Sequence, residues 1–119
     1  MKNVTIEEIS HIVTKGTTPT TIGAEFAYSG IPFIKAENII DGTVKIDSST
    51  LFINHRTDEL LARSRIQPGD VLITIAGTIG RTALVSENSP MLNCNQAVAI
   101  IRPKDVVDPK YLMYCFQSK

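Results

Sequence analysis

The stretch QPGDVLITIAGTIGR, residues 67–81, decides the fold because it places an apolar strand between two turns that contain glycine. Pro68-Gly69 predicts a turn, and residues 70–75 predict a buried strand. Gly77-Thr78-Ile79-Gly80 then predicts a reversal into a second strand over residues 81–85. The sequence therefore predicts a hairpin of two strands here.

The tip of this hairpin carries polar side chains. We expect Thr78 and Arg81 to face the solvent there, and the fork of an arginine guanidinium matches a phosphate group or the edge of guanine. The alternative is that Gly77 and Gly80 only permit a tight turn, and that Arg81 is an ordinary solvated residue. Both interpretations stay open from these residues alone.

The rest of the chain predicts short strands joined by turns. A helix capped by Asn54 or Thr57 interrupts them. Leu60 and Leu61 should form its buried side, whereas residues 4–12 fit either a strand or a short helix. The other strands predicted are residues 31–35, 43–46, 51–53 and the fully apolar 97–101, with a hairpin turn at Asp41-Gly42. This order predicts an α+β domain built on a twisted, mainly antiparallel sheet, partly barrel-like, with a few short peripheral helices.

Asp108-Pro109 predicts the start of a last helix, because proline fits the first helical turn. The chain thus divides into a domain over residues 1–107 and a helix over residues 108–119. Because this helix is apolar on nearly all sides, it either packs into the body or continues in a longer chain, and we favour a shortened chain. Its candidate partner-binding residues are Tyr111, Met113 and Phe116.

The charge balance limits the kind of partner. The 119 residues include 12 basic and 12 acidic side chains, which argues against a protein that holds nucleic acid by bulk charge. Residues 1–59 carry five basic and eight acidic side chains, and residues 60–119 carry seven and four, so the halves differ in sign. Such an uneven distribution can orient one face toward an anion.

No signal peptide or membrane span is expected, because no apolar segment is long enough, and we expect a cytoplasmic protein. Cys94 and Cys115 lack the spacing of a metal or redox pair, so a reduced, structural role is expected. His11 and His55 are isolated from other ligand types. The sequence therefore predicts neither a metal site nor a cofactor.

The patterns required for catalysis are missing from the sequence. Lys35-Ala36-Glu37 reverses the acid-x-Lys order of common metal-dependent nucleases, and Asp70 as a hydrolase residue has no second group. No histidine is tied by sequence to Cys94, so a buried thiol is expected there instead of a nucleophile. We therefore do not expect an enzyme.

Two polar loops offer groups suited to DNA. One combines a cation with four hydroxyls that suit phosphate contacts, and the other supplies amides of the kind that pair with adenine. These residues are Lys15, Thr17, Thr18, Thr20 and Thr21 in the first loop, and Asn93, Asn95 and Gln96 in the second. Such side chains also commonly satisfy their own loop backbone. Together with Lys35 and Arg81, they favour recognition modestly.

Six segments in this order resemble a target recognition domain of the specificity subunit of type I restriction-modification systems. They are residues 15–20 (KGTTPT), 30–34 (GIPFI), 67–72 (QPGDVL), 77–81 (GTIGR), 95–96 (NQ) and 108–112 (DPKYL). The resemblance implies a noncatalytic module that reads double-stranded DNA in the major groove at one half of a split target. It also implies a methyltransferase subunit that flips and methylates adenine, and, through it, a translocating restriction subunit.

In that family, two such domains are separated by long helices that pair as a spacer, whereas this chain holds one domain and only the start of a spacer-like helix. The leading hypothesis is a DNA-reading domain in which Lys15, Lys35 and Arg81 contact phosphate or guanine. The threonine loop and the amide loop would read bases. The rival hypothesis is a protein-interaction module that uses the apolar C-terminal helix.

Overall fold

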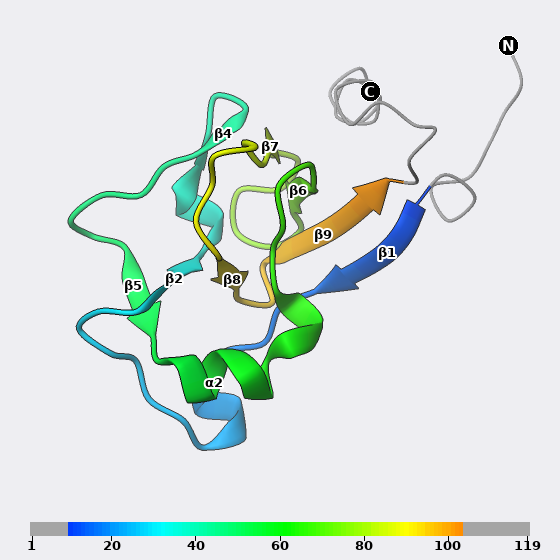
Figure 1. Cartoon of the computed structure of the whole chain (residues 1–119). Helices are drawn as coiled ribbons and strands as arrows, with labels where there is room; N and C mark the ends of the chain where they lie inside the picture. The colour runs from blue at the N-terminus through cyan, green and yellow to red at the C-terminus, as the bar shows by residue number, and fades with distance from the viewer. Residues whose placement is uncertain (1–9, 104–119) are drawn as a thin grey trace, which may run out of the picture.

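The predicted hairpin forms half of the largest sheet in the computed structural model, which describes residues 10–103. This sheet has four antiparallel strands in the order β1-β9-β6-β7. They are β1 (Ser10–Lys15), β9 (Val98–Pro103), β6 (Val71–Thr74) and β7 (Thr82–Leu84). The apolar strand predicted over residues 97–101 is confirmed as β9, between β1 and β6, and Figure 1 shows β1 and β9 side by side.

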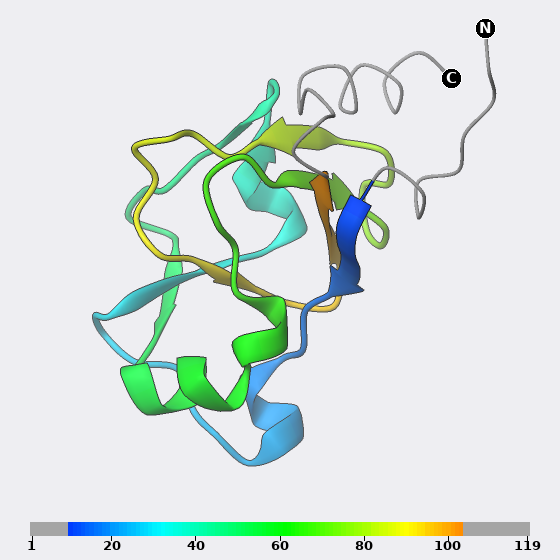
Figure 2. The same ribbon diagram turned by 45° about the vertical axis from the view of Figure 1, so that its right-hand side comes forward.

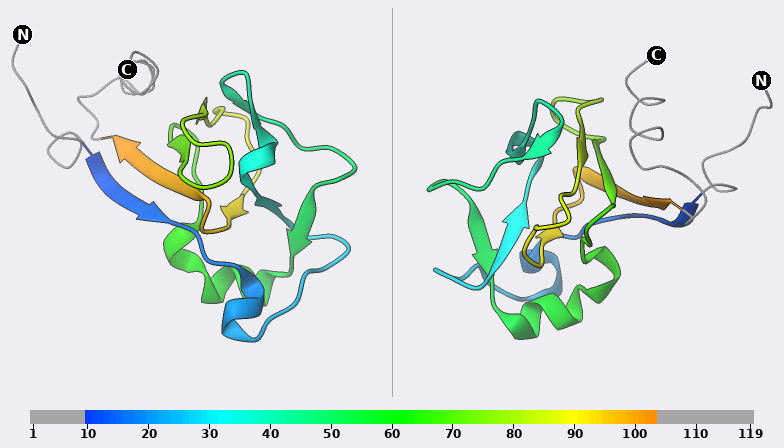
Figure 3. Two further views of the ribbon diagram at one scale, coloured as in Figure 1. Left: turned by 180° about the vertical axis from the view of Figure 1, so that it is seen from behind. Right: turned by 45° about the horizontal axis from the view of Figure 1, so that its top comes forward.

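Two smaller sheets complete the structure. In one, β2 (Ile31–Ile34) lies between β5 (Leu51–Ile53) and β8 (Asn93–Cys94), and β2 and β8 run parallel. The other is the hairpin of β3 (Ile39–Ile40) and β4 (Thr43–Val44). Figure 3 shows, from behind, β1 and β9 on one side of the molecule and β2 and β5 on the other.

The α+β class and the mainly antiparallel pairing are confirmed, but the described residues form three small sheets and no closed barrel. The strand predicted over residues 43–46 ends at Val44. The reason is that its partner strand begins only at Ile39, because residues 36–38 form a 3-10 turn; one more bond in the same register, from the backbone N–H of Lys45 to the carbonyl of Asn38 at 2.7 Å, follows the last strand pair. The turn predicted at Asp41-Gly42 is confirmed, with φ of 51° and 80°.

The predicted helix is α2 (His55–Leu60), followed by a 3-10 turn, η3 (Ala62–Ser64). Asn54 caps it, because its Oδ1 accepts a hydrogen bond from the backbone N–H of Thr57 at 2.8 Å. Leu61 is buried as predicted, but the same prediction for Leu60 is wrong, since that side chain is 63% exposed. Thr57 and Asp58 point inward instead.

Two more 3-10 turns, η1 (Pro19–Ile22) and η2 (Ala36–Asn38), lie in the connections before and after β2. Figure 2 shows η1 at the same end of the molecule as α2. No helix in the described range 10–103 is long and apolar enough to cross a membrane. The helix predicted over residues 108–119, with Tyr111, Met113 and Phe116, lies outside the described residues, as do the first residues of the segment 4–12.

The core joins the sheets into one body. Its main cluster combines residues of the largest sheet with residues of β2, β3, β8 and the adjoining loops: Ile34, Ile39, Ile66, Leu72, Ala83, Val85, Leu92, Cys94, Val98 and Ile100. A second cluster of Ile31, Phe33, Ile53 and Leu61 packs α2 onto β2 and β5. The loop between β6 and β7 contributes no residue to these clusters, so its side chains are available at the surface.

Candidate nucleic-acid interface

A buried threonine holds the tip of the β6–β7 hairpin. The hydroxyl of Thr74 donates to the carbonyl of Thr78 and accepts from the backbone N–H of Arg81, the latter at 2.8 Å. Gly77 and Gly80 take φ of 73° and 94°, which favour glycine, so they permit the reversal. Thr78 and Arg81 are exposed, which confirms the prediction that the tip presents them to solvent.

This tip forms one wall of an open groove of about 510 Å³, which we call the polar groove. The other walls come from the segment after β2 and from the connection between β8 and β9. The lining residues are Lys35, Ala36, Glu37, Ala76, Gly77, Thr78, Arg81, Asn95 and Ala97. Four side chains predicted from separate parts of the sequence to bind DNA, Lys35, Thr78, Arg81 and Asn95, therefore meet around one space.

The segment after β2 is held by a buried asparagine. Asn38 is buried, its Oδ1 accepts from the backbone N–H of Lys35 at 2.9 Å, and its Nδ2 donates to the carbonyl of Lys45 at 3.1 Å. The ammonium of Lys35 lies 3.0 Å from a carboxylate oxygen of Glu37. Within the described part of the chain, by contrast, no ion pair or side-chain hydrogen bond engages the guanidinium of Arg81, so its donors are available for a ligand.

Asn95 sets the connection between β8 and β9. Its backbone N–H donates to the carbonyl of Ile34 at 3.0 Å, and its Oδ1 accepts from the backbone N–H of Ala97 at 3.0 Å. No hydrogen bond to another described residue involves the Nδ2 of Asn95. One side of this amide therefore shapes the turn and the other side remains available to a ligand in the groove.

The threonine loop lies against this connection. A Cβ on Gly16 would lie 1.9 Å from the carbonyl oxygen of Cys94, so only glycine allows the two backbones to approach this closely. The hydroxyl of Thr18 donates to Oε1 of Gln96. Thr20 and Thr21 are exposed on η1, and Lys15 is exposed at the end of β1, while Thr17 is half-buried. The first loop is therefore ordered beside the Asn95–Gln96 edge of the polar groove.

Asn93 does not share this exposed position, and the prediction that it lies in an exposed loop is wrong. It is 0% exposed, its Nδ2 donates to Asp58 Oδ1 and to the carbonyl of Leu61, both at 3.0 Å, and its Oδ1 accepts from Ser64 Oγ at 2.6 Å. Every polar atom of this amide is occupied inside the protein. Asn93 is buried because it lies on β8, between the buried Leu92 and Cys94.

Asn93 belongs to a chain of internal polar contacts, which we call the buried network: Asp58, Ser64, Arg65, Asp70, Asn93 and Arg102. Asp70 is 0% exposed and forms a two-pronged ion pair with Arg102, at 2.7 Å and 2.9 Å. Its hydrogen bonds raise the pKa of the Arg102 guanidinium further above its ordinary value. Asp70 therefore joins β6 to β9, and it is not positioned as a hydrolytic group.

Cys94 is buried as expected. Burial raises the pKa of its thiol to about 12, with a further contribution from the negative charge of Asp70. The thiolate required of a nucleophile is therefore scarce at neutral pH. Among residues 10–103 there is also no group of three or more His, Cys, Asp or Glu side chains that could hold a metal ion.

Glu37 is a charged residue of the groove to which sequence reasoning gave no binding role. It is exposed on η2 and pairs with Lys35, whereas the sequence analysis considered it only as part of a reversed nuclease pattern. The signal was present, since Lys35 and Glu37 lie two positions apart at the end of a buried strand. The 3-10 turn that brings both side chains to one groove was not apparent from that spacing.

Comparison with known proteins gives consistent matches. The family model "Type I restriction modification DNA specificity domain" matches residues 1–119. The type I restriction enzyme EcoBI specificity subunit of Escherichia coli is 34% identical over 84 residues, which is 70% of this chain and 17% of that protein.

Solved structures agree on the fold. A chain from a type I R-M system, described for its complex assembly and conformational transition, has a TM-score of 0.72 at 20% identity, over 96% of this chain and 26% of that one. The crystal structure of the HsdS subunit from Thermoanaerobacter tengcongensis has a TM-score of 0.71 at 18% identity, with the same shares of each chain. This chain thus spans about a quarter or less of these relatives. By its family model, it belongs to the type I restriction modification DNA specificity domains.

Proposed function

We propose that this domain reads its DNA target through the polar groove and the threonine loop beside it. The observation that carries the proposal is the meeting of Lys35, Thr78, Arg81 and Asn95 around one open space. Their segments are far apart in sequence, and each is fixed by buried contacts behind it. Rigid support of this kind suits a surface that must discriminate between similar ligands.

Family membership confirms the resemblance read from the sequence, and a DNA specificity domain is noncatalytic. The buried positions of Asp70 and Cys94 agree with that class. Recognition is therefore the activity to be explained by the geometry of the groove.

Each side chain of the groove suits a different chemical group of the DNA. Arg81 has five donors in a planar fork, which can bind O6 and N7 of guanine together, while Lys35 supplies a point charge for a phosphate. Nδ2 of Asn95 is suited to N7 of adenine. Thr78 and the threonine loop, with Lys15 and Gln96, add phosphate and base-edge contacts at the rim. Asn93 is left out of this proposal because its amide is occupied.

We also propose that the domain works inside a larger assembly in the cytoplasm. Its partners would be a methyltransferase subunit, which flips and methylates adenine, and, through that subunit, a translocating restriction subunit. The support is the small share of each relative that this chain spans, together with the complex assembly described for one of them. Residues 108–119 would begin the spacer helix, and Tyr111, Met113 and Phe116 would contact a partner. The domain itself would need no cofactor.

Selection from a pool of randomised duplexes tests the proposal. The purified chain, alone and with a type I methyltransferase subunit added, should enrich one short sequence. Because the net charge is zero, we expect weak affinity for random DNA and a shallow dependence on salt. Failure to enrich any sequence in either form would contradict the proposal. Salt-tolerant binding to a protein partner without DNA binding would favour an interaction module instead.

A further inference from the structure

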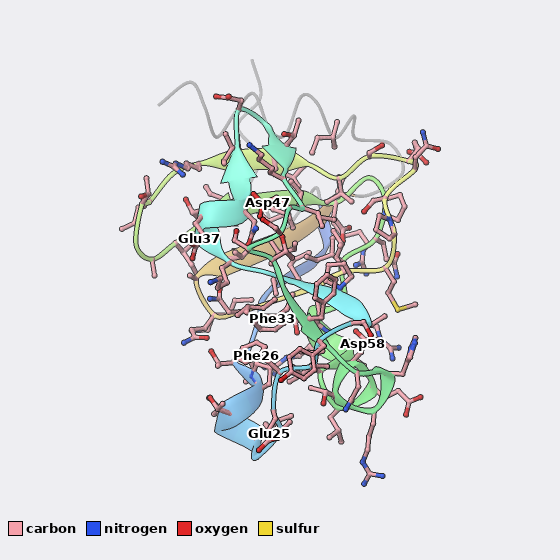
Figure 4. The ribbon with its side chains drawn as sticks, turned by 90° about the vertical axis from the view of Figure 1, so that its left-hand side faces the viewer. Glu25, Phe26, Phe33, Glu37, Asp47 and Asp58 are labelled. Carbon is pink, nitrogen blue, oxygen red and sulfur yellow. The ribbon has the colours of Figure 1, made fainter. Side chains whose placement is uncertain are left out.

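Glu37 is the acidic residue among the described residues that line the polar groove. Its side chain is 70% exposed and lies 3.0 Å from the ammonium of Lys35, whose side chain is 29% exposed. Figure 4 shows Glu37 toward the same edge of the molecule as the loop between β6 and β7. A carboxylate therefore lies where DNA phosphates would approach.

Buried contacts fix the position of the turn that carries this carboxylate. Glu37 lies on the short η2 turn, and the side chain of the buried Asn38 bonds to the backbone of Lys35, just before that turn, and to the backbone of Lys45, just after β4. The ion pair then limits the rotation of the Glu37 side chain. Exposed ion pairs contribute little to folding, so stability alone is a weak reason for a charge at this place.

The groove otherwise has few acceptors for a base. Lys35 and Arg81 only donate hydrogen bonds. Oδ1 of Asn95 already accepts from the backbone N–H of Ala97. A cytosine presents its N4 amino group in the major groove as a donor, and a carboxylate is a fitting acceptor for it. Glu37 supplies that acceptor, held by Lys35.

We propose that Glu37 is a specificity-determining residue that accepts a hydrogen bond from the N4 amino group of a cytosine in the target. This inference rests on the proposed function and deepens it. With Arg81 donating to a guanine, the groove would read donor and acceptor groups of G·C base pairs. The repulsion between Glu37 and phosphates would weaken binding to other sequences, which adds to discrimination.

The test combines a protein change with a base change, using the full chain with its methyltransferase partner. Each cytosine of the selected target is replaced in turn by a 2-pyrimidinone nucleoside, which lacks the 4-amino group. Wild-type affinity should fall roughly 5- to 150-fold at one position, the range of one good base contact. Glu37→Ala should bind the normal and the modified duplex at that position equally.

Glu25→Ala is the matched control. Glu25 is exposed, and Figure 4 places it at the bottom of the view, apart from Glu37, which lies further up on the left. This variant should keep the wild-type response at every cytosine. Circular dichroism and thermal unfolding of both variants should match the wild type, because neither side chain is buried.

Two results would overturn the inference and leave the proposed function standing. In one, Glu37→Ala binds target and random DNA more tightly by the same factor and keeps its sensitivity to the missing amino group. In the other, no cytosine of the selected target responds to that loss. If the wild-type complex selects no sequence, the proposed function fails together with this inference.

Discussion

Asn93 and Asn95 are two positions apart in the sequence and have opposite surroundings. Asn93 lies in the buried network, and all its polar atoms bond to residues of the α2–η3 region or to its own backbone neighbour. Asn95 lies on the polar groove, where one side of its amide shapes a turn and the other side has no described partner. The residue type is the same, so the difference lies entirely in which groups surround each amide.

The same contrast separates two arginines, one on β9 and one just before β7. Arg102 on β9 is bound to Asp70 and to the carbonyl of Arg65, whereas the guanidinium of Arg81, before β7, has no partner within residues 10–103. Polar groups bound inside the protein stabilise the fold, and those held at the surface by rigid neighbours are available for a ligand. This comparison predicts that changes in the buried network lower stability, and that changes in the groove lower DNA binding.

One substitution at both asparagines gives the largest contrast. Asn93→Asp would place a carboxylate where Nδ2 now donates to Asp58 Oδ1 at 3.0 Å, so two buried charges of the same sign would meet. We expect the free energy of unfolding to fall by about 3 kcal/mol or more. Asn95→Asp keeps the acceptor for Ala97 and should change stability by less than about 0.5 kcal/mol, while it weakens DNA binding.

Urea unfolding and duplex titration measure the two effects. The comparison would be broken if Asn93→Asp left stability intact, or if Asn95→Asp unfolded the domain.

Arg102→Ala should be nearly as destabilising. It removes the partner of Asp70, which is 0% exposed, and leaves a buried carboxylate without its cation. We expect a loss of roughly 3 kcal/mol in urea unfolding, with specific DNA binding retained at temperatures where the variant is folded. Arg56→Ala, on the exposed side of α2, is the control and should stay within about 0.5 kcal/mol. If Arg102→Ala lowered the free energy of unfolding by a similarly small amount, the ion pair with Asp70 would not be needed for stability.

Arg81→Ala tests the other arginine. Specific binding should weaken by roughly 1–3 kcal/mol if the fork reads a guanine, while the unfolding curve stays unchanged. Arg81→Lys should restore little, because a lysine cannot reproduce the two parallel donors. Arg63→Ala is a control, since Arg63 is exposed in η3 and outside the groove. An unchanged affinity for Arg81→Ala would remove Arg81 from the site.

The buried region should also respond to alkaline pH. The pKa of Cys94 is raised from 9.0 to about 12, so the thiol is neutral in the folded protein at pH values where the unfolded chain loses this proton. Its contribution to stability is fully present below pH 9 and falls as pH rises toward 12. At pH 10 the loss should be on the order of 1 kcal/mol. A Cys94→Ala variant, in a Cys115→Ser background, should lack this part of the decline, and an identical decline in both proteins would contradict the assignment.

Local sequence patterns predicted the elements that depend on neighbours along the chain. The hairpin, its exposed tip, the central strand and the Asn54 cap all follow from apolar runs, turn residues and a capping side chain. Partners that are distant in sequence were not predictable in this way. Ser64 and Asp58 lie 29 and 35 positions from Asn93, so nothing near Asn93 indicated that its amide is occupied.

The same limit explains the other differences. Leu60 is apolar, but Asp58 turns inward to meet Asn93 and Arg65, which leaves Leu60 on the outer side of α2. The polar groove likewise forms from three segments, and only their packing brings Glu37 close to residues that the sequence had suggested. Residue types indicated which groups could bind DNA, and the tertiary contacts determined which of them are available.

Thr74 is a buried residue that supports the polar groove, and changing it should have the smallest effect on stability and binding. Its side chain is fully buried, yet its hydroxyl holds the backbone of Thr78 and Arg81 at the groove. Thr74→Val keeps the shape and removes these bonds, so we expect a loss of about 1 kcal/mol in stability and weaker specific binding. Thr74→Ser retains the hydroxyl and should restore binding. Faster hydrogen exchange at the Arg81 amide in Thr74→Val would locate the change at the tip, and unaltered exchange with reduced binding would mean that Thr74 acts elsewhere.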